Sequence, residues 1–305
     1  GKHFHVITSL PNVFLKSLDY PHEKIKLLDL EDESVWEDET LGVNHLHQLN
    51  WKQGLDLYPC TECGRCKEVC PTYVTDKPLN LHDFNDTLKA ELYANADNLI
   101  LRAKLAKTLT GDEEADAKTR EKIAVFKPEK ALVGDVIALD TLWACTTCRA
   151  CEQVCPVTIE HVPRIIALRQ GQTLMQGQYP EELNTAFKGL ERNGNPWGIG
   201  YDKRADWAEG LDVKLMADHP DAEYLLWVGC AGSFDDRTQK VTKALVKILK
   251  AADVDFAILG TEEKCTGDFA RRSGNEMMYQ MMATENIEVL NGYSVKKIIA
   301  ACPHC

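Results

Sequence analysis

Two short runs of cysteine constrain this sequence more than any other feature. Each run has the spacing C-x2-C-x2-C-x3-C and is followed directly by a proline, Pro71 in the first and Pro156 in the second. The eight cysteines are Cys60, Cys63, Cys66 and Cys70, then Cys145, Cys148, Cys151 and Cys155. This spacing is typical of [4Fe-4S] ligation, because three thiolates two residues apart can reach three corners of one cube. The fourth corner must take a residue from elsewhere.

In chains with two such runs, the fourth cysteine of each run ligates the cluster held by the other run. The predicted ligands are Cys60, Cys63, Cys66 and Cys155 for cluster 1, and Cys145, Cys148, Cys151 and Cys70 for cluster 2. This exchange ties two distant segments of the chain into one small domain.

Disulfides, structural zinc and catalytic thiols are the alternative uses of these cysteines. Disulfides form in oxidising compartments, but the first residues lack the basic start, apolar core and cleavage site of an export signal. Zinc sites usually take cysteine pairs separated by a long loop rather than four cysteines in one short run. The twelve cysteines therefore indicate metal thiolates in a reducing cytoplasm.

Length and charge set further limits. The 305 residues are enough for two or three domains, and no apolar run approaches the roughly 18 residues that a spanning helix needs. The net charge is −12, and acidic residues crowd residues 29–39 around Trp36, which we interpret as a solvated face. Nucleic acid is excluded as a partner, because phosphate binding needs a basic surface.

The first cysteine domain is expected over residues 58–190, after an N-terminal segment of residues 1–57. A helical insertion over residues 71–144 joins the two runs, since apolar residues recur at helical spacing from Leu88 to Ala106. Residues 111–120 are polar and are expected to form an exposed loop. His161 follows the second run, and we interpret it as a structural or hydrogen-bonding residue, because four cysteines already complete each cluster.

Beyond this domain the pattern changes to alternating strands and helices. Turn-forming residues predict a linker over residues 191–218. Apolar runs at residues 224–228, 254–259 and 298–301 then predict three strands in a βαβαβ order, with a small parallel sheet and right-handed crossovers. The predicted fold class is α+β and multi-domain: a mostly helical dicluster domain precedes a small α/β cysteine-rich domain over residues 219–305.

Four more cysteines lie just after the predicted strands. They are Cys230, Cys265, Cys302 and Cys305. Because the carboxyl ends of parallel strands meet at one edge of a sheet, we expect these thiols to converge on a third metal site, with zinc or free thiols as the alternatives. The chain stops at the last of these cysteines, so we expect the domain to continue beyond it.

These motifs resemble the iron–sulfur proteins related to the D-type subunit of heterodisulfide reductase. The resemblance covers most of the chain. It is carried by both cysteine runs and by residues 142–151, 155–157, 159–162, 195–198, 229–232, 265–268, 270–272 and 274–276. Within that family, the sequence looks like the membrane-linked branch that passes electrons between electron-transfer flavoprotein and a quinone.

The resemblance implies both additions and departures. In that branch a membrane haem b domain precedes a segment similar to residues 2–15, so haem b is expected only in a separate or missing membrane segment. The family's cysteine-rich domain usually occurs in two copies with a doubled cysteine, which supports a noncubane cluster. Here position 266 is threonine and a second copy is absent. The resemblance therefore implies an ordinary [4Fe-4S] cluster at the third site.

The sequence thus predicts an electron-transferring oxidoreductase subunit between a flavoprotein donor and a membrane quinone or haem partner. It would lie on the cytoplasmic side of the membrane, as a peripheral part of a membrane-bound complex. No catalytic residue is assigned, because no Ser-His-Asp, Gly-x-Gly-x-x-Gly or P-loop pattern is present. The alternatives are a heterodisulfide-type disulfide reductase subunit and a zinc-stabilised interaction module.

Overall fold

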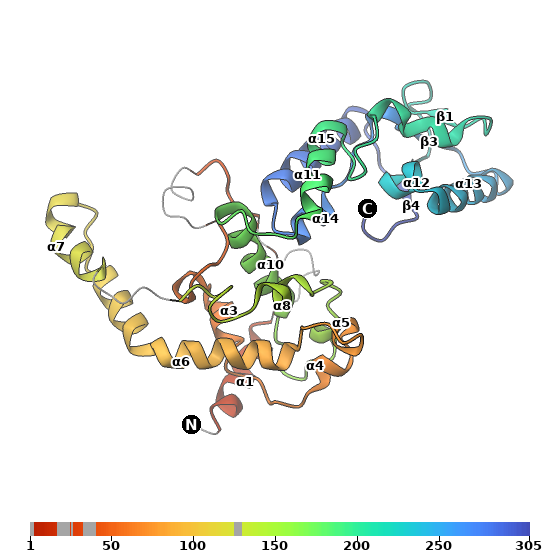
Figure 1. Cartoon of the computed structure of the whole chain (residues 1–305). Coiled ribbons are helices and arrows are strands. Elements are labelled where there is room, and N and C mark those ends of the chain that lie inside the picture. Colours follow the sequence, from red (N-terminus) through yellow and green to blue (C-terminus); the bar gives the residue numbers. More distant parts are fainter. Residues whose placement is uncertain (1–2, 17–24, 26, 33–40, 125–129) are drawn as a thin grey trace. The chain divides into compact units, whose positions relative to one another are not determined.

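The computed structural model describes residues 3–16, 25, 27–32, 41–124 and 130–305. The chain forms two compact units, Gly1–Gln178 and Tyr179–Cys305 (Figure 1). Most of the acidic stretch interpreted as a solvated face, residues 33–39, lies outside the described residues.

The named elements of the first unit are all helical. Most are short, and the cysteine runs lie between them. They are α1 (Phe4–Phe14), η2 (Leu46–Gln48), α3 (Trp51–Leu55), α4 (Arg65–Glu68), α5 (Pro71–Val74), α6 (Leu81–Ala106), α7 (Glu113–Ala124), α8 (Leu139–Trp143), α9 (Ala150–Gln153), α10 (His161–Gln170) and the π-helical turn η3 (Gly171–Met175).

The core of this unit joins α6 to α8 and α10. Leu88, Leu142 and Leu168 are fully buried in it, and Leu92 and Leu99 of α6 pack against its edge. The apolar side of α6 therefore packs on the core of the first unit. The helix begins earlier than predicted, because Asn80 caps it by accepting a hydrogen bond from the backbone N–H of His82.

The expectation of an exposed loop over residues 111–120 is wrong. Residues from Glu113 onward form α7, which packs against the end of α6. Its N-terminal turn is closed by two carboxylates: Asp112 accepts from the backbone N–H groups of Glu114 and Ala115, and Asp116 accepts from those of Thr110 and Gly111. The segment lacks an apolar period, so the sequence pattern did not indicate this helix.

The second unit contains a small parallel sheet surrounded by helices. Its strands are β1 (Lys214–Leu215), β2 (Tyr224–Trp227), β3 (Phe256–Ile258) and β4 (Ile298–Ala300), in the order β1-β3-β2-β4. Its helices are α11 (Glu182–Asn193), η4 (Tyr201–Ala208), α12 (Gly229–Phe234), α13 (Asp236–Ala251), η5 (Gly260–Glu262), α14 (Asp268–Arg272) and α15 (Glu276–Gly292). A mixed chain with a small parallel sheet is confirmed, and β1 is an additional short strand beside β3.

The two central strands, β3 and β2, are buried on both faces, as is usual for parallel strands, whereas the edge strands β1 and β4 are largely exposed. Leu226 of β2 packs with Val246 of α13 on one face, whereas Leu225 and Trp227 pack toward Val289 of α15 on the other. Alternate residues of a strand point to opposite faces, so β2 supplies both layers of the core. The strands end where α12, η5 and the C-terminal cysteines begin.

Among the described residues, no helix combines the length and the apolar character needed to cross a bilayer.

Candidate metal centres

The first set of thiols surrounds one pocket of the first unit. Cys60, Cys63 and Cys66 from the first run line it together with Cys155 from the second run. Burial, together with the negative charge of Cys60 and Cys155, raises the pKa of Cys66 to about 11. The backbone N–H of Ile159 donates to Cys155 Sγ at 3.4 Å. Amide donors of this kind stabilise a thiolate and tune a metal bound to it.

The second set lies beside the first and has the complementary composition. Burial raises the pKa of Cys145, and nearby Cys70 and Cys148 add to this effect. Burial raises the pKa of Cys151, and the charges of Glu152, Cys145 and Cys148 act in the same direction. Arg169 and the backbone N–H of Thr147, which donates to Cys145 Sγ at 3.3 Å, oppose the rise at Cys145. Cys70, from the first run, thus lies among thiols of the second.

The two runs also match in backbone conformation. Glu62 and Thr147, at equivalent positions, have φ values of 57° and 56°, and Gly64 and Arg149 have φ values of 77° and 62°. Left-handed residues other than glycine are strained and persist where the surroundings require them. Each loop then enters a single helical turn, α4 or α9, and these two turns pack together. The sequence duplication is therefore a duplication of structure.

The third set brings together cysteines from three places in the second unit. Cys230 and Cys265 lie within hydrogen-bond reach of each other, which raises the pKa of Cys230 and lowers that of Cys265. Burial and the charge of Cys302 raise the pKa of Cys305 to about 12. Gly229 has φ +73°, and a Cβ there would lie 2.8 Å from Cys305 Sγ. Only glycine fits this close approach.

The donor sets suit a multi-iron cluster. Across the described ranges, no three Cys, His, Asp or Glu side chains are arranged to hold a single metal ion. A four-iron cluster takes one thiolate at each of four irons, so its ligands lie further apart than those of one ion. Each set offers four thiols, and each has at least one backbone N–H group directed at sulfur.

Two family models match the chain. The model of a 4Fe-4S dicluster domain matches residues 56–159, and the model of a cysteine-rich domain matches residues 224–305. The first contains both cysteine runs, and the second contains the third set. No solved structure matches the chain.

Several curated proteins are similar over nearly the whole chain. An "EtfAB:quinone oxidoreductase" of Syntrophomonas wolfei is 42% identical over 99% of this chain and 42% of its own length. A "Probable membrane-anchored ferredoxin" of Chromohalobacter salexigens is 38% identical over 92% of this chain and 40% of its own length. The D-type subunit of the dihydromethanophenazine:CoB–CoM heterodisulfide reductase of Methanosarcina barkeri is 28% identical over 83% and 56%.

The chain is a homologue of these iron–sulfur oxidoreductases. The resemblance to relatives of heterodisulfide reductase is thus confirmed. The chain spans between 40% and 56% of the length of these three relatives.

A buried arginine of this oxidoreductase homologue lies between the first two sets of thiols. Arg164 of α10 is 0% exposed, and its Nη2 donates to Asn85 Oδ1 at 2.7 Å. Its Nε and Nη1 have no hydrogen-bond partner in the described part of the chain. Burial lowers the pKa of Arg164, whereas Asp56 and the thiolates of Cys151 and Cys60 raise it. A desolvated cation needs a nearby anion, and loaded clusters would provide one on each side.

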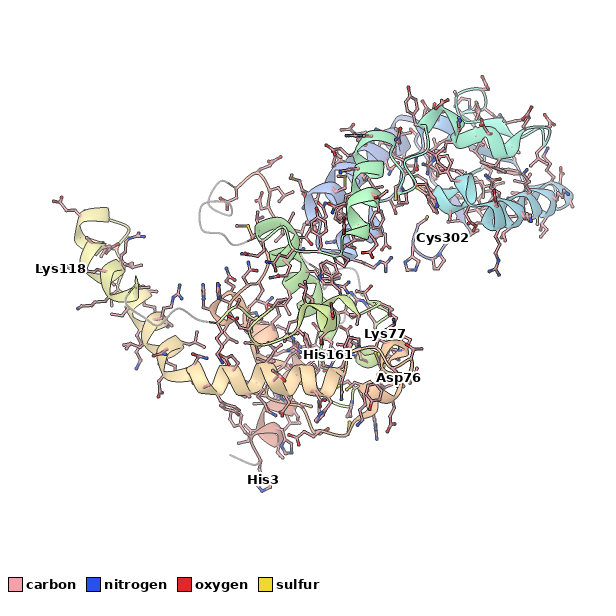
Figure 2. All side chains as sticks on the ribbon, in the orientation of Figure 1. His3, Asp76, Lys77, Lys118, His161 and Cys302 are labelled. Atoms are coloured by element: carbon pink, nitrogen blue, oxygen red, sulfur yellow. The ribbon has the colours of Figure 1, made fainter. Side chains whose placement is uncertain are left out.

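His161, labelled in Figure 2, is the first residue of α10. It also lines the pocket of the first set. Its Nδ1 is 3.4 Å from Arg164 Nη2, and burial lowers its pKa to about 3, with the charge of Arg164 acting in the same direction. A neutral imidazole therefore accepts from the guanidinium, which is the hydrogen-bonding role expected for this residue.

A second buried arginine contacts the third set. Arg204 of η4 donates to Cys230 Sγ at 3.5 Å and to Glu263 Oε1 at 2.7 Å. Glu263 also accepts from the backbone N–H groups of Val228 and Gly229, at 3.0 and 2.8 Å. The ion pair is buried and fixes the turn that presents Cys230. Sequence reasoning missed both arginines, because their partners are distant in sequence and follow no local motif.

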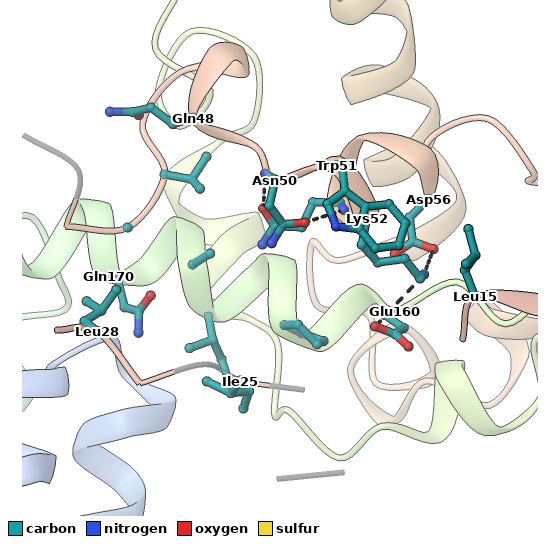
Figure 3. Close-up of a pocket in the computed structure, with 16 residues that line it drawn as sticks. Leu15, Ile25, Leu28, Gln48, Asn50, Trp51, Lys52, Asp56, Glu160 and Gln170 are labelled. Atoms are coloured by element: carbon teal, nitrogen blue, oxygen red, sulfur yellow. Dashed lines mark hydrogen bonds and ion pairs between the residues drawn. The ribbon is translucent and has the colours of Figure 1, made fainter. Parts of the chain in front are cut away.

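The first unit also contains a cavity of about 410 Å³ between α3 and α10 (Figure 3). Lys52 lies in its wall, 2.7 Å from Asp56 and 4.0 Å from Glu160. Leu15, just after α1, and the exposed Trp51 also line it.

Proposed function

We propose that this chain is the iron–sulfur electron-transfer part of an oxidoreductase. The observation that carries the proposal is the crossed arrangement of thiols, in which Cys155 lies with the first run and Cys70 with the second. When bound, [4Fe-4S] clusters supply one-electron relay chemistry. The chain's own residues would hold the clusters and set the charge around them.

The proposed ligands follow the three sets. Cluster 1 would be held by Cys60, Cys63, Cys66 and Cys155, cluster 2 by Cys145, Cys148, Cys151 and Cys70, and a third iron–sulfur cluster by Cys230, Cys265, Cys302 and Cys305. Arg169 and Arg204 each place a guanidinium near one ligand, at Cys145 and Cys230 respectively. Such positive charges favour the more negative, reduced form of a cluster.

The proposed partners are an electron-transfer flavoprotein or a similar donor and a membrane quinone or haem b domain. The names of the relatives support this: one is an EtfAB:quinone oxidoreductase and another is called a membrane-anchored ferredoxin. Haem b would belong to a separate or missing membrane segment. The chain would lie at the cytoplasmic side of the membrane, as a peripheral part of the complex.

We also propose the finer domain plan predicted above. Residues 1–57 would follow a membrane domain, and residues 58–190 would form the dicluster domain. Residues 191–218, which carry η4 and β1 of the second compact unit, would link it to the cysteine-rich domain of residues 219–305. The connections from β2 to β3 and from β3 to β4 would cross in the right-handed sense. Disulfide reduction is not favoured, because position 266 carries a threonine hydroxyl rather than a second thiol.

Anaerobic purification and a redox assay test this function. We expect about four iron and four sulfide for each cysteine quartet, and low-temperature EPR of interacting clusters in the reduced protein. A reduced electron-transfer flavoprotein should reduce the clusters, and a soluble quinone should then reoxidise them. Zinc in place of iron would reject the proposal, and so would turnover of a thiol–disulfide couple without quinone-linked transfer.

A further inference from the structure

Helix α1 is attached to the first unit by its polar side. Asn12 is 0% exposed, and its Nδ2 donates to Asp56 Oδ1 at 3.1 Å and to the carbonyl oxygen of Val157 at 2.8 Å. Thr8, one turn earlier, is also buried. Ser9 Oγ donates to the carbonyl oxygen of Pro59 at 3.4 Å. Polar groups therefore hold this helix in place.

The opposite side of α1 is apolar and faces away from the unit. Five residues on this side are exposed, and we call them the outer stripe: Val6, Ile7, Leu10, Val13 and Phe14. Leu10 is 77% exposed and Phe14 is 86% exposed. A surface helix of a globular protein normally buries its apolar side. In α1 the polar side is buried and the apolar side is exposed. An exposed apolar side of this kind is typical of a surface that binds another apolar surface.

The charge near α1 is also unlike that of the whole chain. The first acidic residue is Asp19, whereas Lys16 follows the helix and is exposed. The whole chain carries a net charge of −12. An apolar stripe without acidic residues, with a lysine at its end, suits the anionic surface of a bilayer. At 11 residues α1 is too short to span a bilayer, so it would lie along the surface.

The contacts of α1 place the outer stripe close to the first set of thiols. Pro59 precedes Cys60, and Val157 follows Cys155 by two residues; both accept hydrogen bonds from α1. Phe4 packs edge-on against Tyr58, with the ring centroids 5.3 Å apart. A surface that receives α1 would therefore lie beside the pocket of Cys60, Cys63, Cys66 and Cys155.

We propose that α1 docks on a lipid bilayer through its outer stripe and thereby holds the first thiol set beside the membrane. The docking itself rests only on the helix. Its use, which makes cluster 1 the point where electrons pass to or from the membrane, rests on the function proposed above.

Vesicle binding tests the docking. The full chain, loaded with its clusters under anaerobic conditions, is sedimented with vesicles of phosphatidylcholine and phosphatidylglycerol. We expect the chain to sediment with the vesicles, and the double variant Leu10→Asp, Phe14→Asp to lose about tenfold in bound fraction, because carboxylates are costly in hydrocarbon. The matched control is Ile100→Asp on α6, which replaces an equally apolar exposed residue outside the outer stripe and should bind as before.

A tryptophan variant tests the same docking without introducing charge, in case the aspartates disturb folding. Phe14→Trp should show a blue-shifted emission with vesicles, whereas Ile100→Trp should not. Absence of vesicle binding, or equal binding by the double variant, overturns the proposal. Dimerisation that the double variant abolishes also overturns it, because the outer stripe would then bind a second copy. None of these measurements needs electron transfer, so reduction by the flavoprotein stays a separate test of the proposed function.

Discussion

Both units hold a buried arginine beside their cysteines, but the two arginines are balanced in different ways. In the second unit Arg204 is paired with the carboxylate of Glu263 at 2.7 Å. In the first unit the hydrogen-bond partners of Arg164, Asn85 and His161, are both neutral. The charge of Arg204 is thus balanced within the protein, whereas that of Arg164 depends more on what the thiol sets carry.

This difference teaches how each interior would respond to its cofactor. A buried charge without a close counter-ion is costly, and two negatively charged clusters near Arg164 would relieve that cost. In the second unit, the carboxylate of Glu263 already provides the counter-ion for Arg204. Loading of the clusters should therefore stabilise the first unit more than the second.

The largest expected effect comes from the crossed ligands. Cys155→Ser should damage the cluster of Cys60, Cys63 and Cys66, with a loss of about four iron, because a hydroxyl is a poorer ligand than a thiolate. The first unit should then become more open to proteolysis or hydrogen exchange. Iron analysis and exchange mass spectrometry measure the two effects.

The matched controls for this variant are Cys70→Ser and Cys230→Ser. Cys70→Ser should instead damage the cluster of the second run, and Cys230→Ser should affect the third set with less change in protection of its unit. The crossed assignment is wrong if each serine in the two runs spoils the cluster of its own run.

The next effect concerns the ion pair of the second unit. Arg204→Met should destabilise this unit by about 3–5 kcal/mol, because it leaves the buried carboxylate of Glu263 without its cation. Adding Glu263→Gln should recover most of the loss, since an amide still accepts from the backbone without carrying charge. Denaturant unfolding of the apoprotein measures both.

An exposed ion pair supplies the comparison for this prediction. Lys264 and Glu285 are 2.7 Å apart but partly solvated, so Lys264→Met should cost less than about 1 kcal/mol. If Arg204→Met and Lys264→Met lowered the free energy of unfolding equally, burial would not make the Arg204–Glu263 pair more important to stability than an exposed pair.

Much of this arrangement could be predicted from the sequence because its cause is local. The cysteine spacing predicted two loops of one kind, and the loops share their left-handed positions, Glu62 with Thr147 and Gly64 with Arg149. The parallel sheet also followed from apolar runs between helical segments. For the four C-terminal cysteines, the rule that strand ends meet at one edge predicts a single shared site.

Three features could not be predicted from the sequence, because they depend on residues distant in the chain or on a helix that buries its polar side. Arg204 contacts Glu263 only in the folded unit, and no sequence motif indicates that these two residues pair. The polar helix α7 depends on carboxylates at its start rather than on an apolar period. In α1 the buried residues are Thr8 and Asn12, so a rule that expects apolar residues inside assigns the wrong face.

The smallest effect expected for either buried arginine is electrostatic, and it distinguishes Arg164 from Arg204 directly. Arg164→Met should leave the apoprotein folded, because an apolar side chain replaces a buried cation that lacks full hydrogen bonding. In the loaded protein it should lower the reduction potentials of clusters 1 and 2. One charge acting over about 10 Å at an effective dielectric constant near 20 is worth roughly 1.7 kcal/mol, or about 70 mV for one electron.

The sign follows from charge alone, because reduction makes a cluster more negative and a nearby cation favours that state. EPR-monitored redox titration measures the shift, and Arg164→Lys is the control, since it keeps the charge and should keep most of the potential. The third set should not move in either variant, because Arg164 acts on Cys60 and Cys151 of the first unit. Equal potentials in Arg164→Met and wild type would show that Asp56 already balances the charge of Arg164. In both units a carboxylate of the protein would then balance the buried arginine.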